Sequence, residues 1–290
     1  MAEPITLLEV QQQPDRKDLF GILNAYLQPS STTSAASAAA AFAALPRTLD
    51  EEFLWGLWKN VIRVAEQLPH DHPAQDRLVL FLQELTLLPD TGVLVWDLPI
   101  WSALPVLSAS IREHLNGPAQ SRDPTEQARI DRSWISFHAF AARLLHAGVL
   151  PSPDETTAIW MLRAALEEAP PPTTTGFARD LATAAVHVLY SGAHLAHLLA
   201  ARPDPALDDA GKRMLKAGSL FREARSLNGG AAGGGEGLVR ERWEFWGVRF
   251  RELGAGTEAD GEELREARRL AARAGRLMGV WTQNLLRRRG

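Results

Sequence analysis

The chain has 290 residues, a formal net charge of −4 and no cysteine. The absence of thiols excludes disulfides, thiolate metal sites and cysteine nucleophiles, and it removes any reason to expect an oxidising compartment. Acidic and basic residues are mixed along most of the chain, so there is no general electrostatic case for nucleic acid or an anionic membrane as a partner. We therefore expect a cytoplasmic protein without nucleic-acid or membrane partners, a nuclear location remaining open.

Apolar residues recur at three- and four-residue spacing in most segments, which is the pattern of amphipathic helices. Residues 1–13 lack the basic and apolar regions of a secretory signal and are expected to form a mobile tail. Helices are predicted at 15–27, 34–44, 50–68, 73–88, 98–115, 123–147, 154–168, 176–200, 211–227, 238–253 and 261–286, and the only strand-like piece is 92–96. The predicted fold class is all-α, an irregular multi-helix bundle or stacked helical hairpins with about ten to eleven helices.

Two segments interrupt this pattern within the single helical domain that we expect over residues 14–290. Three prolines at 170–172, followed by three threonines, form a stiff connector, and the chain is predicted to hinge at 169–175. The glycine-rich run at 228–237 lacks the Lys and Ser or Thr of a Walker loop after Gly237, and no strand precedes it. It is therefore predicted to be a flexible loop and not a phosphate site.

Nine tryptophans are many for this length, and all but Trp96 fall inside predicted helices. A spacing of three places Trp243 beside Trp246 on one helix face. The favoured interpretation is that the tryptophans are large core anchors. The alternative is an aromatic-lined ligand pocket, for which Trp160, Trp243 and Trp246 are the candidates.

Four spaced blocks carry a resemblance to a known family. They are Val95-Trp96-Asp97-Leu98-Pro99, and the segments 134–144, 158–167 and 242–250. In this order they resemble a filamentous-fungal family of uncharacterised helical proteins, domain of unknown function 3632. The resemblance covers about Trp96 to Phe250 and implies a helical fungal accessory protein, encoded beside secondary-metabolite pathways. It supplies no catalytic residues.

One predicted helix carries a cluster of polar groups on a single face. His187, Tyr190, Ser191 and His194 follow i, i+3, i+4, i+7 spacing, and His197 continues the stripe. Such groups could catalyse acid–base chemistry or bind a polar small molecule, with His197 in the pocket. The alternative is a polar seam in which each imidazole bonds a neighbouring helix.

Histidines on the same helix could hold a metal ion only if two of them reach the same point. His187 and His194 are two turns apart, about 10 Å along the axis, which is too far to share one ion. His194 and His197 could share one, but no carboxylate lies between or beside them in the sequence. No metal and no cofactor is therefore predicted.

The last predicted helix, 261–286, has an apolar stripe that needs a partner surface, either the chain's own core or an oligomer seam.

Two hypotheses about function follow for the whole chain. The first is a helical interaction or scaffold protein, an accessory protein of a fungal secondary-metabolite cluster. The second is a small-molecule tailoring enzyme or binding protein of such a pathway that uses the His/Tyr/Ser face. The partner is then a protein or a pathway intermediate, and the sequence leaves open whether the chain is an enzyme.

Overall fold

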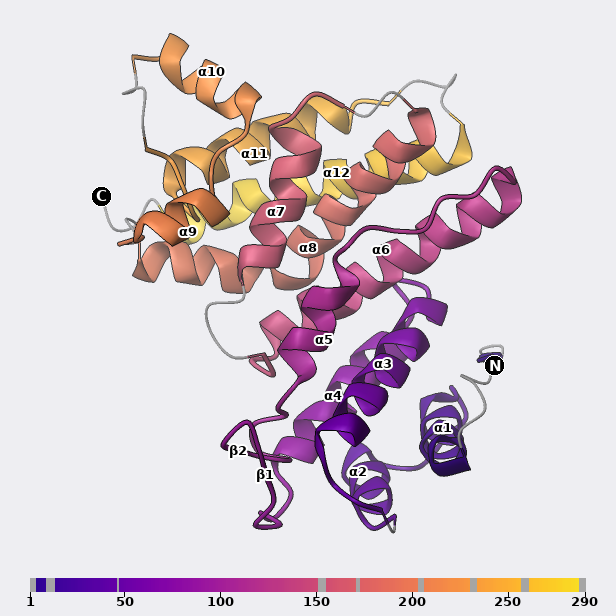
Figure 1. The fold of residues 1–290 in the computed structure, drawn as a ribbon. Helices are drawn as coiled ribbons and strands as arrows, with labels where there is room; N and C mark the ends of the chain where they lie inside the picture. The colour runs from indigo at the N-terminus through magenta and orange to yellow at the C-terminus, as the bar shows by residue number, and fades with distance from the viewer. Residues whose placement is uncertain are drawn as a thin grey trace. The chain divides into compact units, whose positions relative to one another are not determined.

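The computed structural model describes residues 4–8, 14–45, 47–150, 155–170, 173–202, 206–229, 234–256 and 261–286. These residues form twelve α-helices, one π-helical turn and one two-stranded hairpin (Figure 1). The predicted all-α fold class is thus confirmed, and the helix number is close to the predicted one. The chain divides into two compact units, Met1–Pro151 and Ser152–Gly290. The single domain and the hinge at 169–175 stay predictions.

The first unit contains six helices and the hairpin in its described part. They are α1 (Pro14–Leu27), α2 (Ala35–Ala43), α3 (Glu51–Gln67), α4 (Ala74–Thr86), β1 (Leu94–Val95), β2 (Leu98–Pro99), α5 (Leu107–His114) and α6 (Pro124–His146). Helix α3 begins where Asp50 accepts a hydrogen bond from the backbone N–H of Phe53, which satisfies one free donor of the first turn. Helix α2 contacts α1 and α4, whereas α3 contacts α5 and α6.

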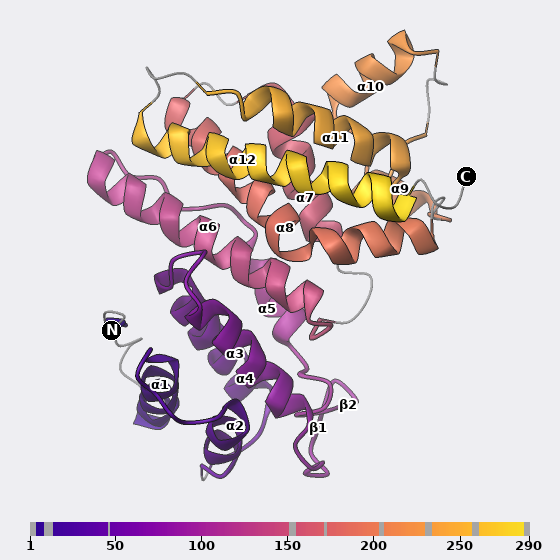
Figure 2. The same ribbon diagram turned by 180° about the vertical axis from the view of Figure 1, so that it is seen from behind.

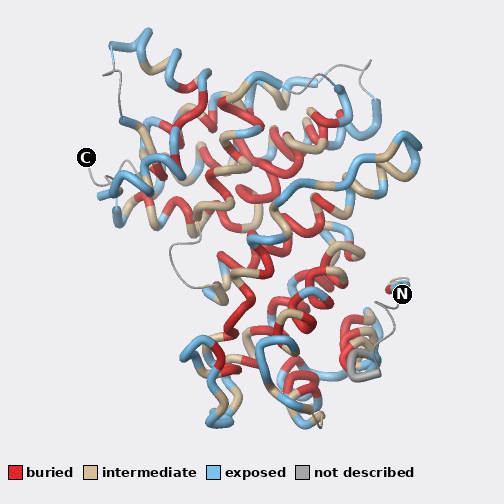
Figure 3. The backbone as a smooth tube through the Cα atoms, viewed as in Figure 1, coloured by how far each residue is buried: buried red, intermediate tan, exposed pale blue. Residues whose placement is uncertain are grey.

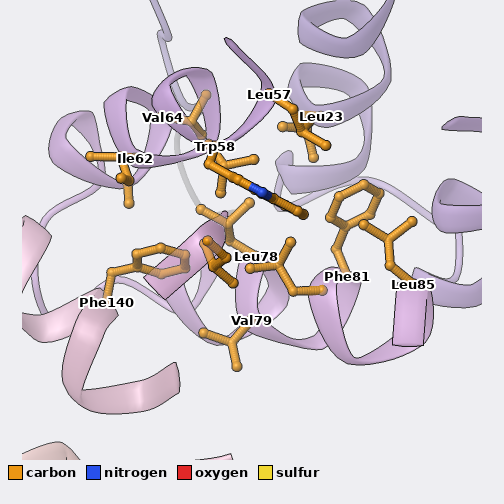
Figure 4. Packing of buried hydrophobic residues seen from close by; sticks show 14 of the residues in the cluster. Leu23, Leu57, Trp58, Ile62, Val64, Leu78, Val79, Phe81, Leu85 and Phe140 are labelled. Carbon is orange, nitrogen blue, oxygen red and sulfur yellow. The ribbon is translucent and has the colours of Figure 1, made fainter. Parts of the chain in front are cut away.

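The core of this unit forms around Trp58, which is fully buried between side chains of α3 and α4 (Figure 4). Its indole N–H donates to the carbonyl of Pro105 at 2.8 Å, so the one polar atom of the ring is satisfied. The buried amide of Gln75 donates to the carbonyls of Ala65, Leu68 and Ser136 and so joins α4 to α3 and α6. Apolar packing and these buried hydrogen bonds together fix the helices.

Part of the predicted N-terminal tail contacts the first unit. The backbone of Ile5 both donates to and accepts from the side-chain amide of Gln28, and Leu7 is buried in the core cluster. Residues 1–3 and 9–13 lie outside the described residues. The tail is therefore tied to α1 at Ile5.

The helix predicted at 98–115 begins only at Leu107, and a hairpin precedes it. Leu94 pairs with Pro99 and Val95 with Leu98, and Trp96 and Asp97 both have positive φ, 54° and 59°, as a type I′ turn requires. Leu104 and Val106 also have positive φ, which no α-helix accepts. The apolar spacing predicted a helix here, but the left-handed residues interrupt it. The hydrogen bond from Trp58 to the carbonyl of Pro105, which lies between them, fixes this backbone conformation.

The second unit consists of α7 (Glu155–Leu166), α8 (Thr174–Ala201), α9 (Asp209–Met214), α10 (Ser219–Leu227), α11 (Arg240–Leu253), α12 (Glu262–Trp281) and the π-helical η1 (Thr282–Leu286). Helix α8 contacts α7 and α12, and α12 also contacts α11 (Figure 2). Buried residues run along α8 and α12, whereas α9 and α10 are mostly exposed (Figure 3). The apolar stripe of α12 therefore packs on the chain's own helices; self-association through this helix stays a prediction.

Helix α8 is the long central element of the second unit. Thr173 accepts from the N–H of Gly176 at its start, and a Cβ on Gly192 would lie 2.4 Å from the ring of Trp281, so glycine lets α12 approach. Among the described residues, α8 is the one helix long and apolar enough for a bilayer span, but 56% of its most apolar window is buried within the protein. A core helix passes the same test, so this is weak evidence for a span.

Candidate functional site

The five polar residues predicted to share one face of α8 are not equally placed. His187 and Ser191 are buried, Tyr190 and His194 are half-buried, and His197 is exposed. The reason is geometric: residues 187 and 191 lie on the stripe that faces the core, and residues 190, 194 and 197 lie on the adjacent stripe. The face is thus graded from interior to solvent.

The buried imidazole is held neutral. Burial lowers the pKa of His187 from its ordinary value of 6.5 to about 3, because the interior disfavours the charged ring. A general acid or base works best when its pKa lies near the operating pH. His187 is therefore poorly suited to proton transfer near neutral pH.

Two further groups of this face bond within their own helix. The hydroxyl of Ser191 donates to the carbonyl of His187 at 2.7 Å, so its proton is already used. Nδ1 of His197 lies 2.7 Å from the carbonyl of Ala193, which can only accept, so this nitrogen carries the proton. Neither arrangement activates a nucleophile. Among the described residues, no group of three or more His, Asp or Glu side chains could hold a metal ion.

The three tryptophans proposed for a ligand pocket use their indole N–H groups inside the protein. Trp160 donates to the carbonyl of Met214 at 2.9 Å, and Trp243 donates to the hydroxyl of Thr282 at 3.1 Å. Trp246 donates to the carboxylate of Glu167 at 2.6 Å. Trp243 and Trp246 are fully buried, so they serve as packing residues.

A small pocket lies at the C-terminal end of α8. It is lined by Glu155, Leu198, Arg202, Leu207, Leu215, Gly237 and Leu238. Its empty volume is about 280 Å³, which includes the part open to solvent. The space in which the centre of a water-sized group can lie is only about 20 Å³, and one water needs about 10–15 Å³ on this measure. None of the predicted site residues lines this pocket, and its size suits one small group.

The pocket contains one ion pair and one carboxylate oxygen that is not hydrogen-bonded. Nη2 of Arg202 lies 3.7 Å from Oε1 of Glu155, and the Glu155 side chain is 14% exposed. Oε2 of Glu155 is buried and accepts no hydrogen bond from the described residues. A group that donates a hydrogen bond could satisfy this oxygen while apolar atoms contact the surrounding leucines.

Beside this pocket lies a buried ion pair that the sequence analysis did not select. Nε of Arg242 donates to Oε1 of Glu167 at 2.5 Å and Nη2 donates to Oε2 at 3.1 Å, and both side chains are 0% exposed. The remaining N–H groups of Arg242 donate to the carbonyls of Leu215, Lys216 and Gly237. All five donors of the guanidinium are therefore used.

The acceptor side of the pair is saturated as well. Besides Arg242, the carboxylate of Glu167 accepts from the indole of Trp246 and from the backbone N–H of Gly218. These bonds bring the Leu215–Gly218 connection onto the end of α7, so the helix predicted at 211–227 is wrong as one element and is split into α9 and α10. The pair organises the backbone and presents no free group to a substrate.

The sequence does contain a signal for this pair. Arg242 lies in an apolar stripe with Val239, Trp243 and Trp246, and a charged residue at such a position needs a buried partner. Glu167 and Arg242 are also the last and first residues of two blocks that carry the family resemblance. Their pairing across 75 positions could not be read from either block alone.

The described fold defines an all-α multi-helix protein with a saturated ion pair inside its second unit. The model of a family described as a protein of unknown function, DUF3632, matches residues 58–250, and the chain belongs to this family. The match begins at Trp58, ends at Phe250 and includes both members of the ion pair. The predicted family is thereby confirmed, whereas its restriction to filamentous fungi stays a prediction. No curated protein and no solved structure matches the chain.

Proposed function

We propose that this chain is a cytoplasmic, non-catalytic interaction or scaffold protein, an accessory protein in a fungal secondary-metabolite pathway. The single observation that carries the interaction role is the use of its polar groups. Arg242 and Glu167 are saturated by one another and by the backbone, and Ser191 bonds its own helix. A catalytic site needs groups that remain available to a substrate.

The experiment separates catalysis from interaction by genetic complementation. A strain that lacks the gene is given either the natural gene or one with Tyr190→Phe and His194→Gln, and its metabolites are profiled. Both positions are half-buried, so the changes remove the phenol and the imidazole with little cost to packing. Full restoration by the double variant is the expected result.

Two outcomes contradict parts of this proposal. A stalled product or an accumulated intermediate with a normally folded double variant contradicts the interaction role. An unchanged profile after deletion contradicts the link to secondary metabolism. Trp160→Phe, which removes one indole N–H away from this face, is the control for a general loss of stability.

A second candidate function, binding of a small molecule, is favoured by Oε2 of Glu155 in the pocket, which accepts no hydrogen bond from the described residues. We propose that a ligand with an amine or amide N–H and a short apolar group would bind Glu155 there. The test is native mass spectrometry of the full chain with a library of small alkyl amines and amides. Binding that is lost in Glu155→Gln supports this function, and equal binding by Glu155→Gln contradicts it.

A further inference from the structure

The β1–β2 hairpin of the first unit exposes apolar side chains that the core does not use. Leu94 is 57% exposed, Trp96 is 49% exposed and Leu98 is 44% exposed, within five residues. Single exposed apolar residues are common on protein surfaces, but a group of them marks an interaction site. Tryptophan is also the residue most enriched among those that dominate binding energy.

The backbone holds Trp96 at the tip of the hairpin at an energetic cost. Trp96 and Asp97 occupy both central positions of the turn with φ of 54° and 59°. Glycine, asparagine and aspartate accept this geometry easily, whereas a tryptophan is strained there by about 1 kcal/mol or more. The ring is about half exposed, so its burial does not offset this strain. The turn thus holds part of the indole in solvent.

The ring of Trp96 is oriented by a second tryptophan. Its centroid lies 6.3 Å from that of Trp55 with an angle of 72° between the rings, an edge-to-face contact. The indole N–H of Trp55 donates to Glu51 at 3.2 Å. The contact places a carboxylate from the start of α3 beside the aromatic pair.

The two segments that carry the hairpin and the start of α3 are acidic. Segments 48–58 and 87–105 contain five acidic residues and no Lys, Arg or His; the acids are Asp50, Glu51, Glu52, Asp90 and Asp97, all exposed. Basic residues flank the first segment: Arg47, whose guanidinium lies over the ring of Phe53, precedes it, and Lys59 follows it. An apolar, aromatic surface with this charge attracts cations, and a cation stacks favourably on an indole face.

We propose that the hairpin surface, Leu94, Trp96, Leu98 and Trp55 with their acidic neighbours, docks a basic amphipathic segment of a partner protein. This inference rests on the proposed interaction role. Arg or Lys side chains of the segment stack on Trp96 and pair with Asp97 and Glu51, while its apolar residues contact Leu94 and Leu98. An anionic lipid surface is disfavoured, because the same acids repel it.

The test selects ligands for the full-length chain from a random library of 15-residue peptides. Enriched peptides should carry a net positive charge together with Leu, Ile or aromatic residues. Trp96→Asn removes the ring but keeps a residue suited to the turn, and it should weaken binding about 30-fold. Asp97→Asn removes one exposed charge in the same turn and should weaken binding by about twofold to fivefold, with a smaller salt dependence.

Leu227→Asn removes a side chain that is 82% exposed on the second unit and is the matched control; it should bind as the natural chain does. Enriched peptides without positive charge, or unchanged binding by Trp96→Asn, overturn the proposal. So does sedimentation with phosphatidylserine vesicles that requires Trp96, because it assigns the surface to a membrane. These failures leave the complementation result of Tyr190→Phe with His194→Gln untouched, so the interaction role is tested separately.

Discussion

Arg242 is the residue at which stability and chain geometry depend most directly on one side chain. A buried ion pair gains little over an apolar pair, but removal of one partner leaves an unpaired charge in the interior. Here the loss would also free three carbonyls that accept from the guanidinium. The main role of the pair is therefore to fix the path of the chain between α9 and α10.

We expect Arg242→Lys to lower the free energy of unfolding by about 3–5 kcal/mol, because an ammonium cannot reproduce the planar array of five donors. Urea denaturation followed by circular dichroism measures the change. Arg240→Lys is the matched control, since Arg240 and its partner Glu244 on the same helix are about half exposed. The control should change stability by no more than about 1 kcal/mol. A similarly small loss in Arg242→Lys would contradict the assigned role.

His187 makes stability depend on pH. Its folded pKa is about 3 against an ordinary 6.5, so below pH 6.5 the unfolded chain binds a proton that the folded chain does not. The free energy of unfolding contributed by the neutral, buried His187 is fully present above pH 6.5. It decreases as the pH falls from 6.5 toward 3, by about 1.4 kcal/mol per pH unit. His187→Gln should remove this part of the pH dependence.

The measurement compares unfolding free energies at pH 7.5 and pH 5.5. The decrease between the two should be about 1.4 kcal/mol smaller in His187→Gln than in the natural chain. His197→Gln, which removes an exposed imidazole from the same helix, is the matched control. Equal decreases in the two variants would show that His187 is not the group responsible.

At the scale of elements, close approach of helices depends on glycine at a few points. Gly254 ends α11, and a Cβ placed there would lie 2.7 Å from the backbone nitrogen of Ala272 in α12. Backbone cannot move aside as a side chain can, so α11 and α12 would have to separate. Gly279 on α12 has open space around it.

We therefore expect opposite effects from the same substitution at these two positions. Gly254→Ala should destabilise the protein by about 1–3 kcal/mol through overpacking. Gly279→Ala should stabilise it by about 0.5–1 kcal/mol, because alanine favours the helix interior. Thermal denaturation of both variants provides the measurement, and a stabilised Gly254→Ala would mean that the α11–α12 contact is looser than described.

Helix positions were predictable from the sequence wherever apolar spacing decided the structure. Helices α3, α6 and α11 lie within two residues of their predicted bounds at each end. The errors at 98–115 and 211–227 have another origin. Left-handed backbone at Leu104 and Val106, and the hydrogen bonds from Arg242 to the Leu215–Gly218 connection, depend on partners distant in the sequence.

The candidate site was less predictable than the fold for the same reason. The spacing of His187, Tyr190, Ser191 and His194 correctly placed them on one helix, but it could not say which of them faces the interior. In the sequence, Glu155 is one of several acids at predicted helix starts, and nothing there distinguishes it from the others. Its Oε2 is buried and accepts no hydrogen bond from the described residues, because Leu198, Leu207 and Leu238 surround it in the pocket.

At the scale of the whole molecule, the division into two units falls at Pro151–Ser152 and not at the proline-rich connector. Helix α7 ends at Leu166 and α8 begins at Thr174, but the two helices contact each other within the second unit. A boundary between units depends on contacts across it and not on local stiffness. The predicted hinge at 169–175 therefore lies within the second unit, and it stays a prediction.

Each unit has its own buried core, around Trp58 in the first and around Trp243 and Trp246 in the second. At about 150 residues or slightly fewer, each is long enough for an independent domain. We expect fragments 1–151 and 152–290, produced separately, to be helical and to unfold cooperatively in urea.

Fragments cut at the predicted hinge, 1–170 and 171–290, are the matched control. This cut separates Glu167 from Arg242 and α7 from α8, so 171–290 should show a weak or absent transition. A cooperative 171–290 fragment beside an unfolded 152–290 fragment would place the boundary at the connector after all.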